Sequence, residues 1–264
     1  MLYLFIMIKE KTIIFTDLDG TLLDHNTYDF EAAMLMLDYI NTNKIPLIIV
    51  TSKTKDEVLR IQKLLNIRAP FIVENGAGIF IPSKKSYEMI SMGFDYGYIR
   101  SCFLKYAKSV PMLGFCDMKD EEVARYTNLS IENASDAKNR TFTEPFILKD
   151  ESRLDELRLM ANEDELDIVK GGRFYHLITM GQDKANAIKY LINDYEKSSD
   201  EDFKTIALGD SANDLTMLQS VDIPVLIPHP DGTFMECNIE GGIKAPFPGP
   251  KGWNAVLKGY FDVK

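Results

Sequence analysis

The sequence of 264 residues has few cysteines, few histidines and no long hydrophobic run. Its three cysteines, Cys102, Cys116 and Cys237, are too few and too scattered for a disulfide framework, which favours a reducing compartment such as the cytoplasm. We expect each to be a small buried hydrophobe. The three histidines have no metal-ligand spacing that would indicate zinc. The apolar run at residues 2–8, LYLFIMI, is too short to span a bilayer and does not resemble a signal peptide.

The chain also has no excess of positive charge. Its 30 basic and 40 acidic residues give a net charge of −10, which argues against nonspecific binding to nucleic acid or to an anionic membrane. An anionic substrate must therefore be attracted by a local metal ion and by local Lys or Arg side chains. The hydrophobic fraction of 45% and the charged fraction of 27% are typical of a soluble globular protein. The length suits one large domain or two modest ones.

Residues 11–23, KTIIFTDLDGTLL, combine a short apolar run with two acids. The run at residues 12–16 predicts a buried parallel strand, and open α/β sheets bind ligands beyond the carboxyl ends of their strands. Side chains two apart in an extended segment point the same way, so Asp17 and Asp19 can approach one reaction centre. Two close carboxylates need a cation or a proton, and Mg²⁺ suits oxygen ligands. Paired acids also occur in ordinary turns, so other motifs must decide.

Residues 17–24, DLDGTLLD, resemble the first motif of the haloacid dehalogenase-like phosphohydrolases. The resemblance implies that Asp17 attacks phosphorus and forms an aspartyl-phosphate. It implies that Asp19 acts first as general acid and then as general base. It also implies a Mg²⁺ cofactor.

The second and third motifs of that family have counterparts here. The apolar run at residues 47–50 predicts a strand that ends at Thr51, at the same sheet edge as Asp17. A helix N-cap at Thr51 and Ser52 also fits, and capping is compatible with anion binding. Lys184 opens a helical pattern, where an isolated lysine is usually just solvated. By resemblance, Thr51 binds a phosphoryl oxygen, and Lys184 neutralises both the nucleophile and the transferring group.

The fourth motif, GDSAND at residues 209–214, follows an apolar run at residues 205–208. Two acids four residues apart at a strand-to-helix turn can converge on a metal ion. By resemblance, Asp210 is a Mg²⁺ ligand, and Asp214 either binds the metal or holds a metal-bound water. The predicted metal ligands are therefore Asp17, the backbone carbonyl of Asp19, Asp210 and Asp214.

Alternating apolar strands and helical patterns predict an α/β fold with a doubly wound, parallel-sheet, Rossmann-like core. A helix is expected at residues 28–43, and Asn75-Gly76 predicts a hairpin between strands at residues 71–73 and 79–81. From residue 84 to about residue 179, acidic helical stretches alternate with shorter apolar runs, which predicts an inserted α+β cap. We expect the core at residues 1–83 and 180–264 and the cap at residues 84–179.

Four short segments resemble the mannosyl-3-phosphoglycerate phosphatase branch of the family. They are TSKT at residues 51–54, ENG at 74–76, RTFTEPF at 140–146 and GGRFYH at 171–176. The resemblance implies a substrate with a phosphate, a carboxylate and a sugar. Arg140 and Arg173 can fork onto its carboxylate or phosphate, although surface salt bridges would also explain them. Further substrate-binding candidates are Ser52, Glu74, Asn75, Glu144, Gly171 and Gly172; Glu74 or Glu144 would accept sugar hydroxyls, while His176 is expected to be a packed strand residue.

The combined prediction is a Mg²⁺-dependent phosphatase that hydrolyses mannosyl-3-phosphoglycerate or glucosyl-3-phosphoglycerate. Its expected partner is this small molecule, with no nucleic acid and no membrane, and the oligomeric state is left open. The alternatives are a general sugar-phosphate phosphatase, a phosphomannomutase-like phosphotransferase and a non-catalytic phospho-ligand sensor. A mutase would need a bisphosphate activator, and a sensor would not need all of Asp17, Asp19, Lys184 and Asp210.

Overall fold

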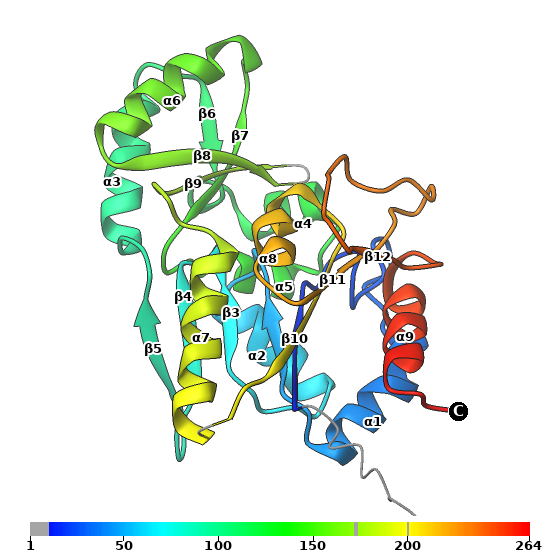
Figure 1. The fold of residues 1–264 in the computed structure, drawn as a ribbon. Coiled ribbons are helices and arrows are strands. Elements are labelled where there is room, and N and C mark those ends of the chain that lie inside the picture. Colours follow the sequence, from blue (N-terminus) through cyan, green and yellow to red (C-terminus); the bar gives the residue numbers. More distant parts are fainter. Residues whose placement is uncertain (1–10, 172–173, 200) are drawn as a thin grey trace, which may run out of the picture.

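The structure is a computed structural model that describes residues 11–171, 174–199 and 201–264. The apolar run at residues 2–8 and the candidates Gly172 and Arg173 lie outside the described residues. The described elements form a sheet of eight strands and a sheet of four (Figure 1). No helix in the described ranges is both long and apolar enough to cross a membrane.

The large sheet has a parallel centre and an antiparallel edge. In spatial order its strands are β12 (Ile243–Lys244), β11 (Ile223–Leu226), β10 (Lys204–Gly209), β1 (Thr12–Thr16), β2 (Leu47–Val50), β3 (Phe71–Val73), β4 (Gly78–Pro82) and β5 (Tyr87–Ser91). The strands from β12 to β3 are parallel, whereas β4 and β5 are antiparallel. The order of strands reverses between β1 and β10, which confirms the predicted doubly wound core. The antiparallel pairing of β3 with β4 confirms the predicted hairpin.

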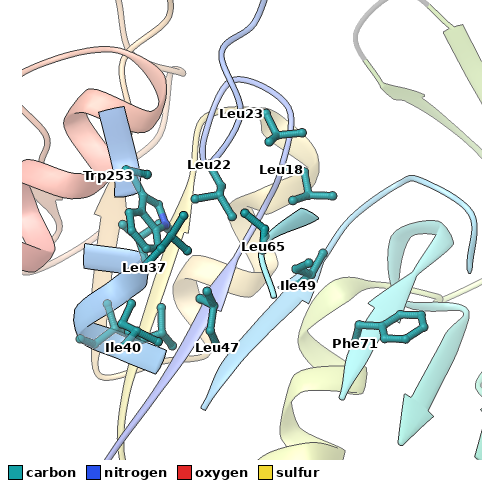
Figure 2. Close-up of a cluster of buried hydrophobic side chains, with 14 of the residues drawn as sticks. Leu18, Leu22, Leu23, Leu37, Ile40, Leu47, Ile49, Leu65, Phe71 and Trp253 are labelled. Atoms are coloured by element: carbon teal, nitrogen blue, oxygen red, sulfur yellow. The ribbon is translucent and has the colours of Figure 1, made fainter. Parts of the chain in front are cut away.

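Helices cover both faces of the large sheet. On one face lie α1 (Met34–Asn43), α2 (Lys55–Leu64) and α9 (Gly249–Tyr260), and on the other lie α7 (Lys184–Ser199) and α8 (Leu215–Gln219). Ile14 faces the first group, and its neighbours Ile13 and Phe15 face the second. A strand covered on both faces is apolar without interruption, as β1 is. Figure 2 shows part of the first cluster, in which Trp253 lies beside Leu37.

All elements of the second sheet fall between β5 and α7 in the chain. Its antiparallel strands, in spatial order, are β6 (Met112–Gly114), β7 (Glu144–Leu148), β9 (Phe174–Thr179) and β8 (Leu166–Gly171). It shares a separate hydrophobic cluster with α3 (Tyr96–Tyr106) and α6 (Leu154–Glu163). The connection from β6 to β7 contains α4 (Asp120–Thr127) and α5 (Ile131–Lys138). We call residues 94–171 and 174–179 the small-sheet unit; its strands β6, β7, β8 and β9 lie above the large sheet in Figure 1.

Each short 3-10 helix directly precedes an α-helix or directly follows a strand. They are η1 (Glu31–Ala33), η2 (Glu74–Gly76), η3 (Phe115–Asp117), η4 (Glu151–Arg153) and η5 (Ala212–Asp214).

β5 pairs with β4, so the large sheet continues beyond residue 83.

Two local expectations were wrong. The helix expected from residue 28 begins later, because Tyr28 has a left-handed φ of 57° and follows a turn in which Asp24 Oδ1 accepts N–H bonds from Asn26 and Thr27. This polar turn competes with helix formation. Cys102 is buried as expected, but Cys116 is exposed and Cys237 is only partly buried.

Candidate active site

The first and fourth motifs meet at the switch point of the large sheet. Asp17 follows β1 and Asp210 follows β10, and these strands are parallel neighbours in register. The Asp17 N–H also donates to Leu208 O at 3.0 Å. The two carboxylates therefore lie at the sheet edge where α/β proteins bind their ligands.

Lys184, at the first turn of α7, joins two of the acids. Its Nζ lies 2.8 Å from Asp17 Oδ1 and 2.6 Å from Asp214 Oδ1, and its side chain is 1% exposed. Burial alone lowers the pKa of Lys184, but the adjacent carboxylates Asp17 and Asp214 reverse this and raise it. The ammonium is therefore fixed as a cation between the two acids.

Three carboxylates could hold a metal ion together. One oxygen from each of Asp17, Asp210 and Asp214 can be chosen so that all three lie within 4.8 Å of one another, and all three residues are buried. Asp19 Oδ1 is also buried and has no hydrogen-bond partner among the described residues. These oxygen donors fit a hard divalent cation such as Mg²⁺.

Burial and mutual repulsion strongly shift the titration of two of these acids. Burial raises the pKa of Asp17 to about 7, and the charge of Asp214 adds to this effect. Burial likewise raises the pKa of Asp210 to about 8, with Asp17 and Asp214 contributing repulsion. A divalent cation would favour the ionised forms of both.

Gly20 permits the close approach of Asp210 to the first motif. A Cβ atom at this position would lie 2.4 Å from Asp210 Oδ2, and Gly20 has a φ of +78°. A side chain here would therefore be both strained and in collision with the proposed metal ligand. Thr21 Oγ1 donates to Asp210 Oδ1 at 3.3 Å.

Backbone and side-chain hydrogen bonds hold the acidic loop in place. Asp214 Oδ2 accepts the N–H groups of Asp210 and Ser211, each at 3.1 Å. His229 Nε2 lies 3.0 Å from Asp210 O. Next to Asp17, Trp253 Nε1 donates to Thr16 Oγ1 at 3.1 Å, and Thr16 Oγ1 donates to Asp17 O at 2.7 Å. Backbone and side-chain hydrogen bonds thus position the three acids.

Asp19 forms an ion pair with Lys53, which was not among the predicted site residues. Lys53 Nζ lies 2.9 Å from Asp19 Oδ2 and 3.7 Å from Glu57 Oε1, with a side chain that is 10% exposed. Burial lowers the pKa of Lys53, but Asp19 and Glu57 reverse the effect and raise it. Lys53 lies two residues after Thr51, the second-motif residue. This spacing could have predicted that Lys53 belongs to the site.

A cavity of about 400 Å³ lies between the acids and the small-sheet unit. The large-sheet part contributes Asp17, Asp19, Ser52, Lys53 and Asp210 among others. The small-sheet unit contributes Phe115, Thr127, Asn128, Leu129, Ala137, Arg140, Pro145, Gly171, Phe174 and His176. The predicted candidates Ser52, Arg140 and Gly171 therefore share one cavity with the motif acids.

Arg140 and His176 form a pair on the cavity wall. Arg140 donates from one terminal nitrogen to Ser52 O at 2.8 Å, while its Nε has no partner among the described residues. Burial, followed by the charge of Arg140, lowers the pKa of His176 to about 3, so its imidazole is neutral. Gly171 allows the ring to approach, because a Cβ there would lie 3.3 Å from His176 Nε2.

The predicted helix N-cap at Thr51 and Ser52 is wrong. Thr51 is 1% exposed and its Oγ1 accepts the N–H of Lys53 at 3.2 Å. The N-cap of α2 is Thr54 rather than Thr51 or Ser52, because Thr54 and Glu57 form a capping box. Of this loop, Ser52 and Lys53 line the cavity, whereas Thr51 does not.

Three other candidates lie outside the residues that line the cavity. Glu74 is fully buried and accepts the N–H groups of Thr141, Phe142 and Thr143, so its carboxylate joins the two units rather than facing a sugar. Glu144 is also fully buried, with bonds from the Tyr96 hydroxyl and the Cys116 N–H. The third, Asn75, has a φ of 59° and accepts a bond from Asn213 Nδ2 at 3.2 Å.

Sequence comparisons identify a family and two relatives that match most of the chain. Residues 14–228 match the family model of the haloacid dehalogenase-like hydrolases. The chain is 47% identical over 256 residues to a Persephonella marina protein named glucosyl-3-phosphoglycerate/mannosyl-3-phosphoglycerate phosphatase, covering 93% of this chain and 95% of the relative. It is 41% identical over 264 residues to a protein of the same name from Methanococcoides burtonii, covering 94% and 96%.

Solved structures share the fold at low sequence identity. A Thermoplasma acidophilum protein superposes with a TM-score of 0.72 at 17% identity, covering 96% of this chain and 99% of the other. The sucrose-phosphatase of Synechocystis superposes with a TM-score of 0.65 at 14% identity, covering 96% and 98%. These solved structures show the fold, and the family model spans most of the sequence. The chain belongs to the haloacid dehalogenase-like hydrolases.

Proposed function

We propose that the protein is a cytoplasmic, Mg²⁺-dependent phosphatase that hydrolyses glucosyl-3-phosphoglycerate or mannosyl-3-phosphoglycerate to the glycosylglycerate and phosphate. The observation that carries this proposal is the buried Asp17–Lys184–Asp214 cluster, whose Asp17 lines the cavity between the two units. The choice of substrate rests on the names of the two relatives that match most of the chain.

Asp17 is the proposed nucleophile. One of its carboxylate oxygens attacks phosphorus, the bond from phosphorus to the glycerate oxygen breaks, and Asp19 donates a proton to that oxygen. Asp19 then takes a proton from a water molecule as the water attacks the aspartyl-phosphate. The bond between Asp17 and phosphorus breaks, inorganic phosphate leaves, and both carboxylates return to their starting states.

Lys184 and the second motif support the charge of the transferring group. The ammonium of Lys184 already contacts Asp17 and is held on its other side by Asp214, so it needs no rearrangement. We assign Thr51 to a phosphoryl oxygen, in keeping with its position at the end of β2.

Mg²⁺ would be held by Asp17, the Asp19 backbone carbonyl, Asp210 and Asp214. When bound, it would screen the charge between the nucleophile and the phosphate and so lower the barrier to attack. Asp214 is already occupied by Lys184 and by two backbone N–H groups, which suits a supporting role beside the metal.

We further propose that the small-sheet unit acts as the substrate-covering cap. Arg140 and Gly171 reach the cavity from this unit, and Arg140 also bonds to Ser52 of the other. A closed cap excludes water while the aspartyl-phosphate forms. Glu74, which binds the backbone at residues 141–143, would fix the connection on which the cap moves.

The test is phosphate release from the two glycosyl-3-phosphoglycerates and from a panel of simple sugar phosphates, with and without Mg²⁺. We expect a preference of about 10² or more for the glycosylated substrates, because a site built for polar groups discriminates strongly against analogues that lack them. Asp17→Asn should abolish turnover, since it removes the nucleophile while keeping the shape of the side chain.

The outcomes separate the alternatives. Equal activity across the panel would replace the proposal with a general sugar-phosphate phosphatase. Phosphate transfer that depends on a bisphosphate activator would indicate a mutase. Binding without Mg²⁺-dependent turnover of any phosphomonoester would indicate a sensor.

A further inference from the structure

Two cations line the cavity among the residues that the structure describes. They are Lys53 and Arg140, whereas Lys184 lies beneath the acids and does not line it. The same cavity is bordered by the carboxylates of Asp17, Asp19 and Asp210. A substrate that carries a carboxylate in addition to its phosphate therefore needs one of these two cations at the place where its carboxylate lies.

Lys53 is held in a defined position. Glu57 Oε2 accepts the N–H of Thr54 at 2.9 Å as part of the capping box, which fixes the carboxylate whose Oε1 lies 3.7 Å from Lys53 Nζ. The ring of Tyr28 lies below the ammonium, with its centroid 5.3 Å from Nζ. A buried lysine that is fixed on two sides has little conformational freedom to lose when it binds a ligand.

The lysine also has hydrogen-bonding capacity to spare. An ammonium has three donors, and Asp19 Oδ2 is the partner at hydrogen-bond distance, 2.9 Å away. The 3.7 Å contact with Glu57 is an ion pair that is too long for a hydrogen bond. Lys53 can therefore accept a second anion without giving up Asp19.

The chemistry of a phosphoglycerate fixes where its carboxylate must lie. The leaving oxygen has to be within hydrogen-bond reach of Asp19 to receive its proton. In a 3-phosphoglycerate, the carboxylate carbon is three covalent bonds from this oxygen, which limits their separation to about 4 Å. The carboxylate is therefore confined to the neighbourhood of Asp19, where Lys53 is the cation in direct contact.

We propose that Lys53 is the specificity-determining residue that binds the carboxylate of the substrate and so selects phosphoglycerate derivatives over neutral sugar phosphates. This inference rests on the proposed function. Arg140 would then contact the glycosyl part of the substrate. It donates to Ser52 O and lies beside the neutral His176. A carboxylate without Lys53 would lie against Asp19 with no compensating charge.

The experiment uses a matched pair of substrates on the full-length protein with Mg²⁺. One is 2-O-glucosyl-3-phosphoglycerate, and the other is the analogue in which a hydroxymethyl group replaces the carboxylate. For Lys53→Met we expect kcat/KM to fall by about 10²-fold on the first substrate, the scale of a lost charged hydrogen bond, and by at most about tenfold on the second. The loss on the first should appear mainly as a higher KM.

Two further variants serve as controls. Lys55→Met removes a cation two residues away that does not line the cavity, and it should keep the wild-type ratio of the two kcat/KM values. Lys53→Arg keeps the charge and should keep the preference within about tenfold of wild type. The ratio is measured within one protein sample, so partial unfolding of a variant lowers both values equally and does not imitate the expected result.

Each outcome bears on a different claim. If Lys53→Met lowers both kcat/KM values equally, Lys53 only positions Asp19 and the inference is overturned. If the wild-type enzyme hydrolyses both substrates equally well, the carboxylate is not recognised and the inference again fails. The enzyme would still be a phosphatase for glycosylated phosphate esters. If the wild-type enzyme hydrolyses neither but releases phosphate from other sugar phosphates, the proposed function itself is wrong.

Discussion

Lys184 is the buried cation between Asp17 and Asp214. It is 1% exposed and separates two buried carboxylates. We expect Lys184→Met to destabilise the protein by about 3–5 kcal/mol, because removing one partner of a buried ion pair leaves an uncompensated charge. Urea unfolding would measure this, with the exposed Lys189→Met on the same helix as control. An equal effect of both variants would contradict a special role for Lys184.

Single residues also mark the limit of prediction from sequence. Asp17, Lys184 and Asp210 could be predicted because strand ends and a helix start bring them to one edge of the sheet. The role of Glu74 could not be predicted. Its carboxylate accepts hydrogen bonds from the N–H groups of residues 141–143, and a local sequence pattern does not indicate a partner so far along the chain. Lys53 was overlooked because its partner Asp19 lies on a different strand-end loop.

Contacts between elements connect the two units around the cavity. Arg60 of α2 donates to Asp136 and Glu132 of α5, and Thr54 Oγ1 donates to Asp136 O at 2.9 Å. Arg60→Ala should weaken closure and raise KM about two- to fivefold, since exposed ion pairs contribute little each. Steady-state kinetics would test this, with Arg158→Ala on α6 as control. High salt should reproduce the effect in the wild-type protein. A KM that responds to neither change would contradict closure through this contact.

Elements were predictable where their pattern is strong. Continuous apolar runs predicted β1, β2 and β10, because strands buried on both faces need no polar alternation. The pairing of β5 with the edge of the large sheet was not predicted: its residues are partly exposed, and its sequence, YEMIS, carries no such run. The start of α1 was misplaced because the Asp24 turn, a hydrogen-bonding feature, overrides the helical spacing that follows it.

The whole molecule should respond to pH through its acidic cluster. On folding, the pKa of Asp17 rises from 3.8 to about 7 and that of Asp210 from 3.8 to about 8. Between pH 3.8 and about pH 8, the folded state therefore binds more protons than the unfolded state. In EDTA, the free energy of unfolding should therefore fall as pH rises from about 4 to about 8. Mg²⁺ should stabilise the protein more at pH 8 than at pH 6, because it favours ionised carboxylates.

Thermal or urea unfolding at several pH values, with EDTA or Mg²⁺, would measure this dependence. Asp210→Asn removes one of the two titrating groups and should flatten the curve obtained in EDTA. Stability that rises with pH in the absence of a divalent cation would contradict the assignment of these acids.

The hydrogen bond between Trp253 and Thr16 joins residues that are 237 positions apart. During synthesis on the ribosome, β1 emerges early, whereas Lys184, Asp210 and finally α9 follow in that order. The nascent chain thus carries Asp17, the proposed nucleophile, long before it has Lys184, the proposed metal ligand Asp210 and the indole of Trp253. Enzymatic activity should consequently switch on late and abruptly, when translation of α9 is complete.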